Sequence, residues 1–229
     1  MEFSILLSGI VVKFGALGLQ RVLSLQGSGI GGFLLASCCM IAMCEASLRI
    51  LAQRDLKRIV ALTTVIEVNW IGVCLGLGGS QFSQVGAFVL VAHSLTTTAE
   101  FYLVECIYKR YQTRDVVGIS GLAFSFPGLH VLVFLNVLTT IGFPGTSLFA
   151  GKLLFLTALA QYSLLLLVLF TVVLVLWLPL VFMRIWVPIW YGQAGLVPLT
   201  PDVSGRESAL LVLCIVGSVW MGLCPSVVL

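Results

Sequence analysis

Residues 142–156, GFPGTSLFAGKLLFL, place Gly142, Pro144, Gly145 and Thr146 a short distance upstream of a lysine in one of the most hydrophobic parts of the chain. Glycine and proline interrupt helices. Non-helical backbone at membrane depth is tolerated only where protein or a water-filled cavity surrounds it, and broken helices expose groups that bind ions or water. The stretch therefore predicts a membrane helix that breaks at Gly142, Pro144 and Gly145, with Lys152 at the start of its second half.

The composition is that of a membrane protein. Of the 229 residues, 60% are hydrophobic and 9% are charged, whereas a soluble domain has about 45–50% apolar and 25% charged residues. A spanning helix needs about 20 mostly apolar residues. The chain therefore has room for several spans, and no room for a soluble domain in addition.

Hydropathy and helix breakers predict an all-α polytopic membrane protein with about seven transmembrane helices, one of them discontinuous. We expect residues 1–229 to form a single transmembrane domain. The predicted spans are 3–25, 32–53, 56–78, 82–108, 119–160 as the interrupted unit, 162–186 and 208–229. Residues 187–207 form the one long predicted loop.

The basic residues support this arrangement. Threading the spans alternately puts Arg21 nearly alone on one side of the membrane. The other side receives Arg54, Lys57, Arg58, Lys109, Arg110, Arg114, Arg184 and Arg206. Because positive charge collects on the cytoplasmic or matrix side, the second side is predicted to be that side.

Several ionisable residues fall well inside the predicted spans, where a charged form costs roughly 2.5–3.5 kcal/mol on insertion scales. They are Lys13, Glu45, Glu67, His93, Glu100 and Lys152. Such groups are functional candidates, because they need partners or hydration to be tolerated. Lys13 and Lys152 have no charged neighbour in sequence, so we expect their partners on other helices or in water.

A polar stripe follows one helix. His93, Thr96, Thr97 and Glu100 are spaced i, i+3, i+4 and i+7, which puts them on one face. Such a stripe can pass protons along, or it can join neighbouring helices by hydrogen bonds. The seven cysteines lie mostly in apolar runs without a CxxC pair, so neither a disulfide framework nor a metal site is predicted.

Four segments resemble, in order, a known family. They are QRDLKRIVALTTVIEVNW, AHSLTTTAEFYLVECIYKR, GFPGTSLFAGKLLFL and DVSGRESALLVLCIVGSVWMGLCPSVVL. They are similar to the C-terminal half of the NADH dehydrogenase (ubiquinone) subunit 4 family, the antiporter-like, proton-pumping membrane subunits of respiratory complex I. The opening VVKFGALGLQR extends the resemblance to the N-terminal end.

The resemblance implies roles for individual residues. Lys13 matches the central lysine of the family's eighth helix, and His93 matches the histidine of its eleventh. Lys152 occupies the place of the acidic residue in the broken twelfth helix, and Glu67 replaces a family histidine. The acid gained at Glu67 is expected to offset the base gained at Lys152. The implied proton path is Lys13, Glu67, His93, Glu100 and Lys152, with Glu45, Thr96 and Thr97 in support.

The match begins at the family's eighth helix, so the chain resembles helices eight to fourteen. We expect the first half to be a separate polypeptide that docks with this one; the alternative is that the half-channel of the first half is lost.

The resemblance implies a proton-translocating subunit of NADH:ubiquinone oxidoreductase in the mitochondrial inner membrane, or in a bacterial plasma membrane. We expect no cofactor on this chain, with NADH, FMN, iron–sulfur clusters and ubiquinone bound by other subunits. Expected partners are neighbouring antiporter-like subunits and lipids such as cardiolipin, and no nucleic acid. The alternatives are a subunit of a multisubunit sodium/proton antiporter and a structural scaffold with an inactive proton path.

Overall fold

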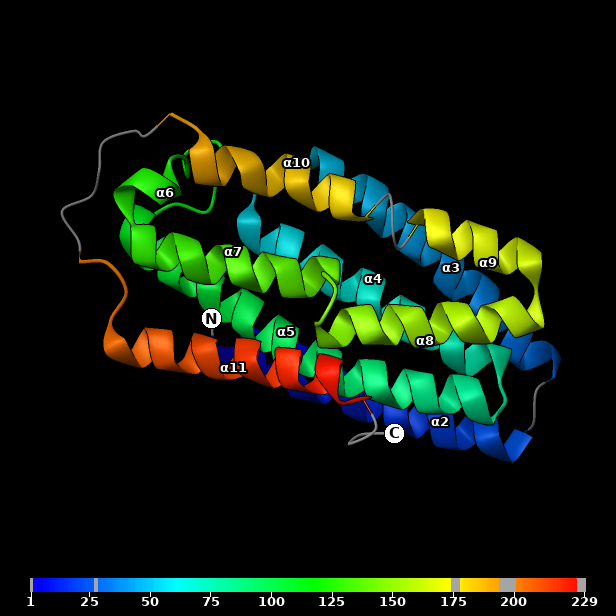
Figure 1. Ribbon diagram of the computed structural model, residues 1–229. Coiled ribbons are helices and arrows are strands. Elements are labelled where there is room, and N and C mark those ends of the chain that lie inside the picture. The colour runs from blue at the N-terminus through cyan, green and yellow to red at the C-terminus, as the bar shows by residue number, and fades with distance from the viewer. Residues whose placement is uncertain (1, 27–28, 174–177, 194–200, 226–229) are drawn as a thin grey trace.

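The computed structural model describes residues 2–26, 29–173, 178–193 and 201–225, which form helices running roughly along one common axis (Figure 1). The elements are α1 (Glu2–Leu6), the π-helix η1 (Leu7–Val11), α2 (Val12–Gln26), α3 (Ile30–Ala52), α4 (Leu56–Leu77), α5 (Ser80–Tyr111), α6 (Leu122–Ser125), α7 (Pro127–Ile141), α8 (Ser147–Tyr162), α9 (Leu164–Thr171), α10 (Leu178–Tyr191) and α11 (Gly205–Leu223). Within these ranges, 5 helical segments are long and apolar enough to cross a membrane, and α7 and α8 are shorter apolar helices. The predicted all-α membrane fold is confirmed.

The first predicted span is one continuous helical segment with an irregular turn. The elements α1, η1 and α2 follow one another without a break, and η1 has the wider hydrogen-bonding pattern of a π-helix. Such single turns of π-helix often occur at functional sites. Here the turn lies directly before Lys13.

The predicted long loop begins too early. Residues 187–191 belong to α10, which contains Pro188 and ends at Tyr191. Proline is tolerated in membrane helices where neighbouring groups replace the lost hydrogen bond. Burial of Trp186, Ile189 and Trp190 holds this turn in place. As a result Arg184, predicted at the end of a span, lies about two turns before the end of α10.

Most of the basic residues lie at one end of the bundle, in the last turns of α3 and α5 and around the starts of α4 and α11. These helix ends lie toward the left in Figure 1. There the backbone N–H of Leu56 donates to the carbonyl of Arg114 at 2.9 Å, and that of Val116 donates to Arg54 at 2.8 Å. The Asp55 carboxylate accepts from the backbone N–H of Lys57 at 2.9 Å and so caps α4. The connection between α3 and α4 is therefore tied to the one that follows α5.

A buried ion pair closes the same end, and we call Arg110, Asp202 and Glu207 the clasp. The Arg110 guanidinium of α5 donates to Glu207 Oε2 of α11 at 2.8 Å and to the carbonyl of Asp202 at 2.9 Å. The side chains of Arg110 and Glu207 are only 6% and 13% exposed. The Asp202 carboxylate accepts from Gly128 N at 2.7 Å and Leu129 N at 3.1 Å, at the start of α7. The clasp thus joins the ends of α5, α7 and α11.

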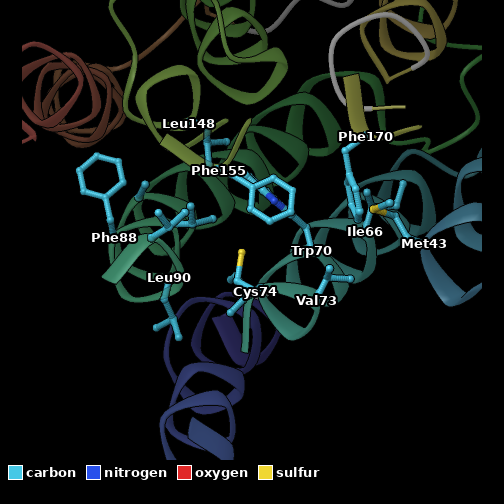
Figure 2. Close-up of a cluster of buried hydrophobic side chains, with 14 of the residues drawn as sticks. Met43, Ile66, Trp70, Val73, Cys74, Phe88, Leu90, Leu148, Phe155 and Phe170 are labelled. Atoms are coloured by element: carbon cyan, nitrogen blue, oxygen red, sulfur yellow. The ribbon is translucent and has the colours of Figure 1, made fainter. Parts of the chain in front are cut away.

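An aromatic core packs the middle of the bundle (Figure 2). Trp70 of α4 contacts Phe155 of α8 edge to face, with ring centroids 5.7 Å apart, and Phe155 contacts Phe170 of α9 at 5.0 Å. All three side chains are buried. Edge-to-face aromatic pairs contribute about 0.5–1.5 kcal/mol each beyond the burial of their area. This core fixes α8, and with it the broken helix, against α4.

Two glycines bring α3 and α4 into backbone contact at the other end. A Cβ atom on Gly32 would lie 2.5 Å from the carbonyl oxygen of Gly76, and one on Gly76 would lie 2.6 Å from that of Gly32. Small residues allow membrane helices to approach this closely. The contact sets the spacing between α3 and α4 near the turn that leads into α5.

Candidate functional site

The broken helix positions Lys152. The first half, α7, ends at Ile141, and the second half, α8, begins at Ser147. Gly142 and Gly145 adopt φ values of +80° and +95°, which side-chain-bearing residues rarely adopt. The Lys152 ammonium donates a hydrogen bond of 2.7 Å to the carbonyl oxygen of Ile141. The charge beside the break therefore binds the last carbonyl of α7, where the helix dipole attracts a cation.

Lys152 shares a small cavity with Glu67 of α4. Both side chains line it together with Thr63 and Thr140, and its volume for the centres of water molecules is about 10 Å³, enough for about one water. Glu67 and Lys152 are 5% and 4% exposed and interact electrostatically. The structure thus brings together the two positions at which the sequence departs from the family pattern.

Glu100 of α5 approaches the same group from another side. Its carboxyl group lies near the hydroxyls of Thr140 and Thr63 and within electrostatic range of Glu67. Glu100 is 5% exposed. The Oε2 atom of Glu67 has no hydrogen-bond partner among the described residues. Glu67, Glu100 and Lys152 therefore form one buried group of two acids and one base, which we call the acid–lysine group.

Lys13 of α2 lies in a second buried group. It is 6% exposed, and its ammonium donates a hydrogen bond to the carbonyl of Ser8 in the π-helical turn. A Cβ atom on Gly9 would lie 2.8 Å from the Thr98 hydroxyl, so this turn is pressed against α5. His93 of α5 lies within electrostatic range of the Lys13 ammonium. Lys13 and His93 form what we call the lysine–histidine pair.

The polar stripe on α5 is buried as a whole. His93, Thr96, Thr97 and Glu100 are between 1% and 5% exposed. Each threonine hydroxyl donates to the backbone carbonyl of His93, at 3.2 Å from Thr96 and 2.7 Å from Thr97. Neither ring nitrogen of His93 has a hydrogen-bond partner among the described residues. A buried imidazole without partners is unusual and is suited to exchange protons with water that reaches it.

Glu45, expected to support the proton path, does not join these groups. Its carboxylate, 58% exposed, pairs with Arg49 one turn away at 2.5 Å. The residue lies on the outer face of α3 because Met43 and Ala46 occupy the inner face.

Some buried polar residues were not singled out by the sequence analysis. Among them, Thr63, Asn136 and Thr140 are 2–5% exposed. Thr63 precedes Glu67 by one helical turn, and Thr140 stands just before the break. A polar residue one turn from an intramembrane carboxylate was the signal that could have identified Thr63.

Comparisons with known proteins agree with this geometry. Residues 1–177 match the family model described as NADH:quinone oxidoreductase/Mrp antiporter, TM. The chain belongs to this antiporter family. The resemblance found in the sequence motifs is confirmed.

Curated relatives include NADH-ubiquinone oxidoreductase chain 4 of Paramecium tetraurelia, 29% identical over 97% of this chain and 48% of the relative. The same subunit of Arabidopsis thaliana is 30% identical over 99% of this chain and 46% of the relative. The chain thus spans about half the length of these curated relatives.

Solved structures share the antiporter-family fold. A chain of the Mrp complex from Dietzia sp. DQ12-45-1b has a TM-score of 0.87 at 19% identity, covering 97% of this chain and 50% of that one. A chain of respiratory complex I from Thermus thermophilus has a TM-score of 0.76 at 22% identity, covering 85% and 41%. These likenesses concern the fold alone.

The two glycines at the break between α7 and α8 are expected to differ in their effect on Lys152. A Cβ atom on Gly142 would lie 3.2 Å from Lys152 Nζ, whereas one on Gly145 would meet nothing within 4 Å. Gly142→Ala and Gly145→Ala should both destabilise the fold by about 1–2 kcal/mol through the left-handed backbone. Only Gly142→Ala should also displace the ammonium, and so slow proton transfer in reconstituted vesicles. Equal transport rates in the two variants would contradict this role of Gly142.

Proposed function

We propose that this chain carries protons within the membrane as a subunit of respiratory complex I. The observation that supports the proposal is the set of five ionisable side chains buried in the bundle, Lys13, Glu67, His93, Glu100 and Lys152. A scaffold of helices would not need such groups, because apolar residues fill a membrane bundle at lower cost.

Transfer within the acid–lysine group follows from mutual charge compensation. When Glu67 is ionised, it stabilises the charged form of Lys152. When a proton arrives on Glu67, this compensation is lost and burial favours release of the proton from Lys152. The repulsion between Glu67 and Glu100 favours one shared proton between the two carboxyls. The group therefore releases a proton from its lysine in response to protonation of its acids.

The two buried groups are separated along α5. Glu100 follows His93 by seven residues, which corresponds to about 10.5 Å of helix. The hydroxyls of Thr96 and Thr97 lie between them and keep lone pairs that can accept hydrogen bonds from water. We propose that water molecules join the lysine–histidine pair to the acid–lysine group along this face.

The surroundings belong to the same proposal. The named relatives are subunits of NADH-ubiquinone oxidoreductase, and we infer that this chain assembles with other membrane subunits of that complex in the mitochondrial inner membrane. Cardiolipin and the region equivalent to the rest of the curated relatives are further proposed partners. We also propose that NADH, FMN, the iron–sulfur clusters and ubiquinone bind to other subunits.

A second candidate is a subunit of a sodium/proton antiporter. The description of the matching family names the Mrp antiporter beside NADH:quinone oxidoreductase, which supports this alternative. Transport that depends on sodium in the absence of NADH would support it. Proton transport driven by NADH oxidation would support complex I.

The proposal is tested on the native assembly in sealed vesicles. Lys13→Met should leave assembly intact and reduce proton translocation per electron transferred, because it removes one of the buried bases. Lys109→Met is the matched control. Lys109 is 53% exposed and pairs only with Glu105 on its own helix, and surface pairs of this kind contribute about 0–1 kcal/mol. Unchanged translocation in assembled Lys13→Met would favour the scaffold reading of the chain.

A further inference from the structure

A cavity lies at the end of the bundle opposite the clasp. Its volume is about 310 Å³, which has room for many water molecules. It lies between α2, α3 and the turn from α4 to α5, at the right in Figure 1. Gly79 and Ser80 at its rim are exposed, while Cys74 and Gly76 in its wall are buried. The cavity therefore reaches from the surface into the bundle.

Polar groups mark the wall that leads inward. Gln20 of α2 donates a hydrogen bond of 2.5 Å to the hydroxyl of Ser83 of α5, and both residues line the cavity. Packing alone does not require this polar pair, because two apolar side chains would fill the same space as well. Its position at the wall of a cavity is typical of groups that hold water.

The two helices that carry this pair also carry the lysine–histidine pair. On α2, Gln20 follows Lys13 by seven residues, which puts both on one face of the helix. On α5, His93 follows Ser83 by ten residues, about three turns farther along the helix. The distance from Gln20 to Lys13 along α2 is about 10.5 Å. Because α2 and α5 run in opposite directions, Lys13 and His93 lie in the same direction from the cavity. We call the interface of α2 and α5 between the cavity and this pair the seam.

Small side chains occupy most of that seam. On α2 only Ala16 lies on the inner face between Gln20 and Lys13, and on α5 Gly86 and Leu90 lie between Ser83 and His93. An added Cβ on Gly86 would be in ordinary contact, 3.6 Å from Cys74 and Leu75. Leu90 is 7% exposed and is the bulkiest of these side chains between the cavity and His93 on α5.

We propose that this cavity is an aqueous vestibule through which the lysine–histidine pair exchanges protons with the side of the membrane opposite the basic loops. The proposal rests on the proposed function and adds a second access point, separate from Lys152. It explains why His93 is buried with two unpartnered nitrogens. Water that enters along the seam supplies the hydrogen bonds that the protein does not.

Cysteine labelling of the native assembly in sealed vesicles tests the vestibule. The probe is a membrane-impermeant sulfonated methanethiosulfonate, added from either side, and mass spectrometry reports each site separately from the natural cysteines. Ser83→Cys reports the cavity and Ala16→Cys reports the seam. Phe33→Cys is the matched control for Ser83→Cys, and Ile41→Cys is the matched control for Ala16→Cys. Each control residue lies in α3 at about the same depth from this end of the bundle as its partner, but Phe33 and Ile41 are 72% and 70% exposed on the outer face of the helix.

Ser83→Cys and Ala16→Cys should react at least about tenfold faster than their controls, because only a thiol in water forms the reactive thiolate. The reaction should occur only from the side opposite the basic loops. Ala16→Cys reacting no faster than Ile41→Cys would show that the cavity ends blindly, and reaction from the basic side would equally overturn the proposal. If Ser83→Cys does not assemble, Gln20→Cys replaces it.

The labelling result is independent of pumping. Labelling reports water access whether or not protons are transported, whereas Lys13→Met reports transport. Slow labelling of Ala16→Cys together with reduced translocation in Lys13→Met would refute the vestibule and leave the proposed function standing. Fast labelling together with unchanged translocation in Lys13→Met would support the vestibule as a wet cavity and refute the function.

Discussion

Lys152→Met is expected to slow proton transfer through this chain by roughly a hundredfold or more, the range seen when a positioned acid or base is removed. It should also destabilise the protein, because Glu67 would remain as a buried acid without its cation. Glu67 and Lys152 interact across their cavity without a direct salt bridge, so the loss should be smaller than the cost of about 3–5 kcal/mol that is typical of a contacting buried pair. The Ile141 carbonyl at the break would lose its donor as well. Proton translocation per electron and the thermal unfolding midpoint of the purified assembly measure the two effects.

The double variant Glu67→Gln with Lys152→Met separates structure from function. Two neutral side chains in the cavity should recover most of the lost stability, because replacing both members of a buried pair is often neutral. Translocation should remain low in the double variant. If transport recovered together with stability, Lys152 would be a structural residue. The single variant Glu67→Gln completes the double-mutant cycle: the stability change of the double variant minus those of the two single variants gives the coupling energy of the pair.

Arg110→Met is expected to disrupt the clasp and to lower the stability of the protein by about 3–5 kcal/mol, because Glu207 would be left partly buried and unpaired. The substitution also removes the donor to the carbonyl of Asp202, whose carboxylate caps α7. The basic end should therefore loosen as a unit. The yield of assembled protein and its unfolding midpoint report this loss.

Arg49→Met provides the control for the clasp. Arg49 also pairs with a carboxylate, that of Glu45 at 2.5 Å, but its side chain is 64% exposed, against 6% for Arg110. An exposed pair contributes at most about 1 kcal/mol. Arg49→Met should therefore assemble almost normally. Comparable losses in the two variants would show that burial does not decide the strength of these pairs.

Most of the fold could be predicted because each span is long, apolar and bounded by glycine or charge. The helix boundaries were less accurate at Pro188, where an aromatic face keeps α10 intact to Tyr191. The π-helical turn at residues 7–11 left no mark in the composition of the segment. It depends on contact with α5, which a single sequence does not reveal.

The sequence could predict which residues belong to the candidate site, but not which of them lie close to one another. Intramembrane charge identified Lys13 and Lys152 as unusual, and both are buried. Hydropathy could not separate Glu45 from Glu67, because both lie inside apolar spans and only packing decides which face is covered. The pairing of Glu67 with Lys152 follows from the approach of α8 to α4 through Trp70 and Phe155.

The backbone contact between Gly32 and Gly76 limits how this end of the molecule can move. Each glycine leaves no space for even a methyl group on the other helix, so α3 and α4 cannot slide past each other without a collision of main chains. A motion that reaches α3 or α4 from a neighbouring subunit would therefore move the two helices together as one rigid unit. The cavity wall that α3 and α4 form would move with them. The width of the cavity opening would then depend on motions of the neighbouring subunits.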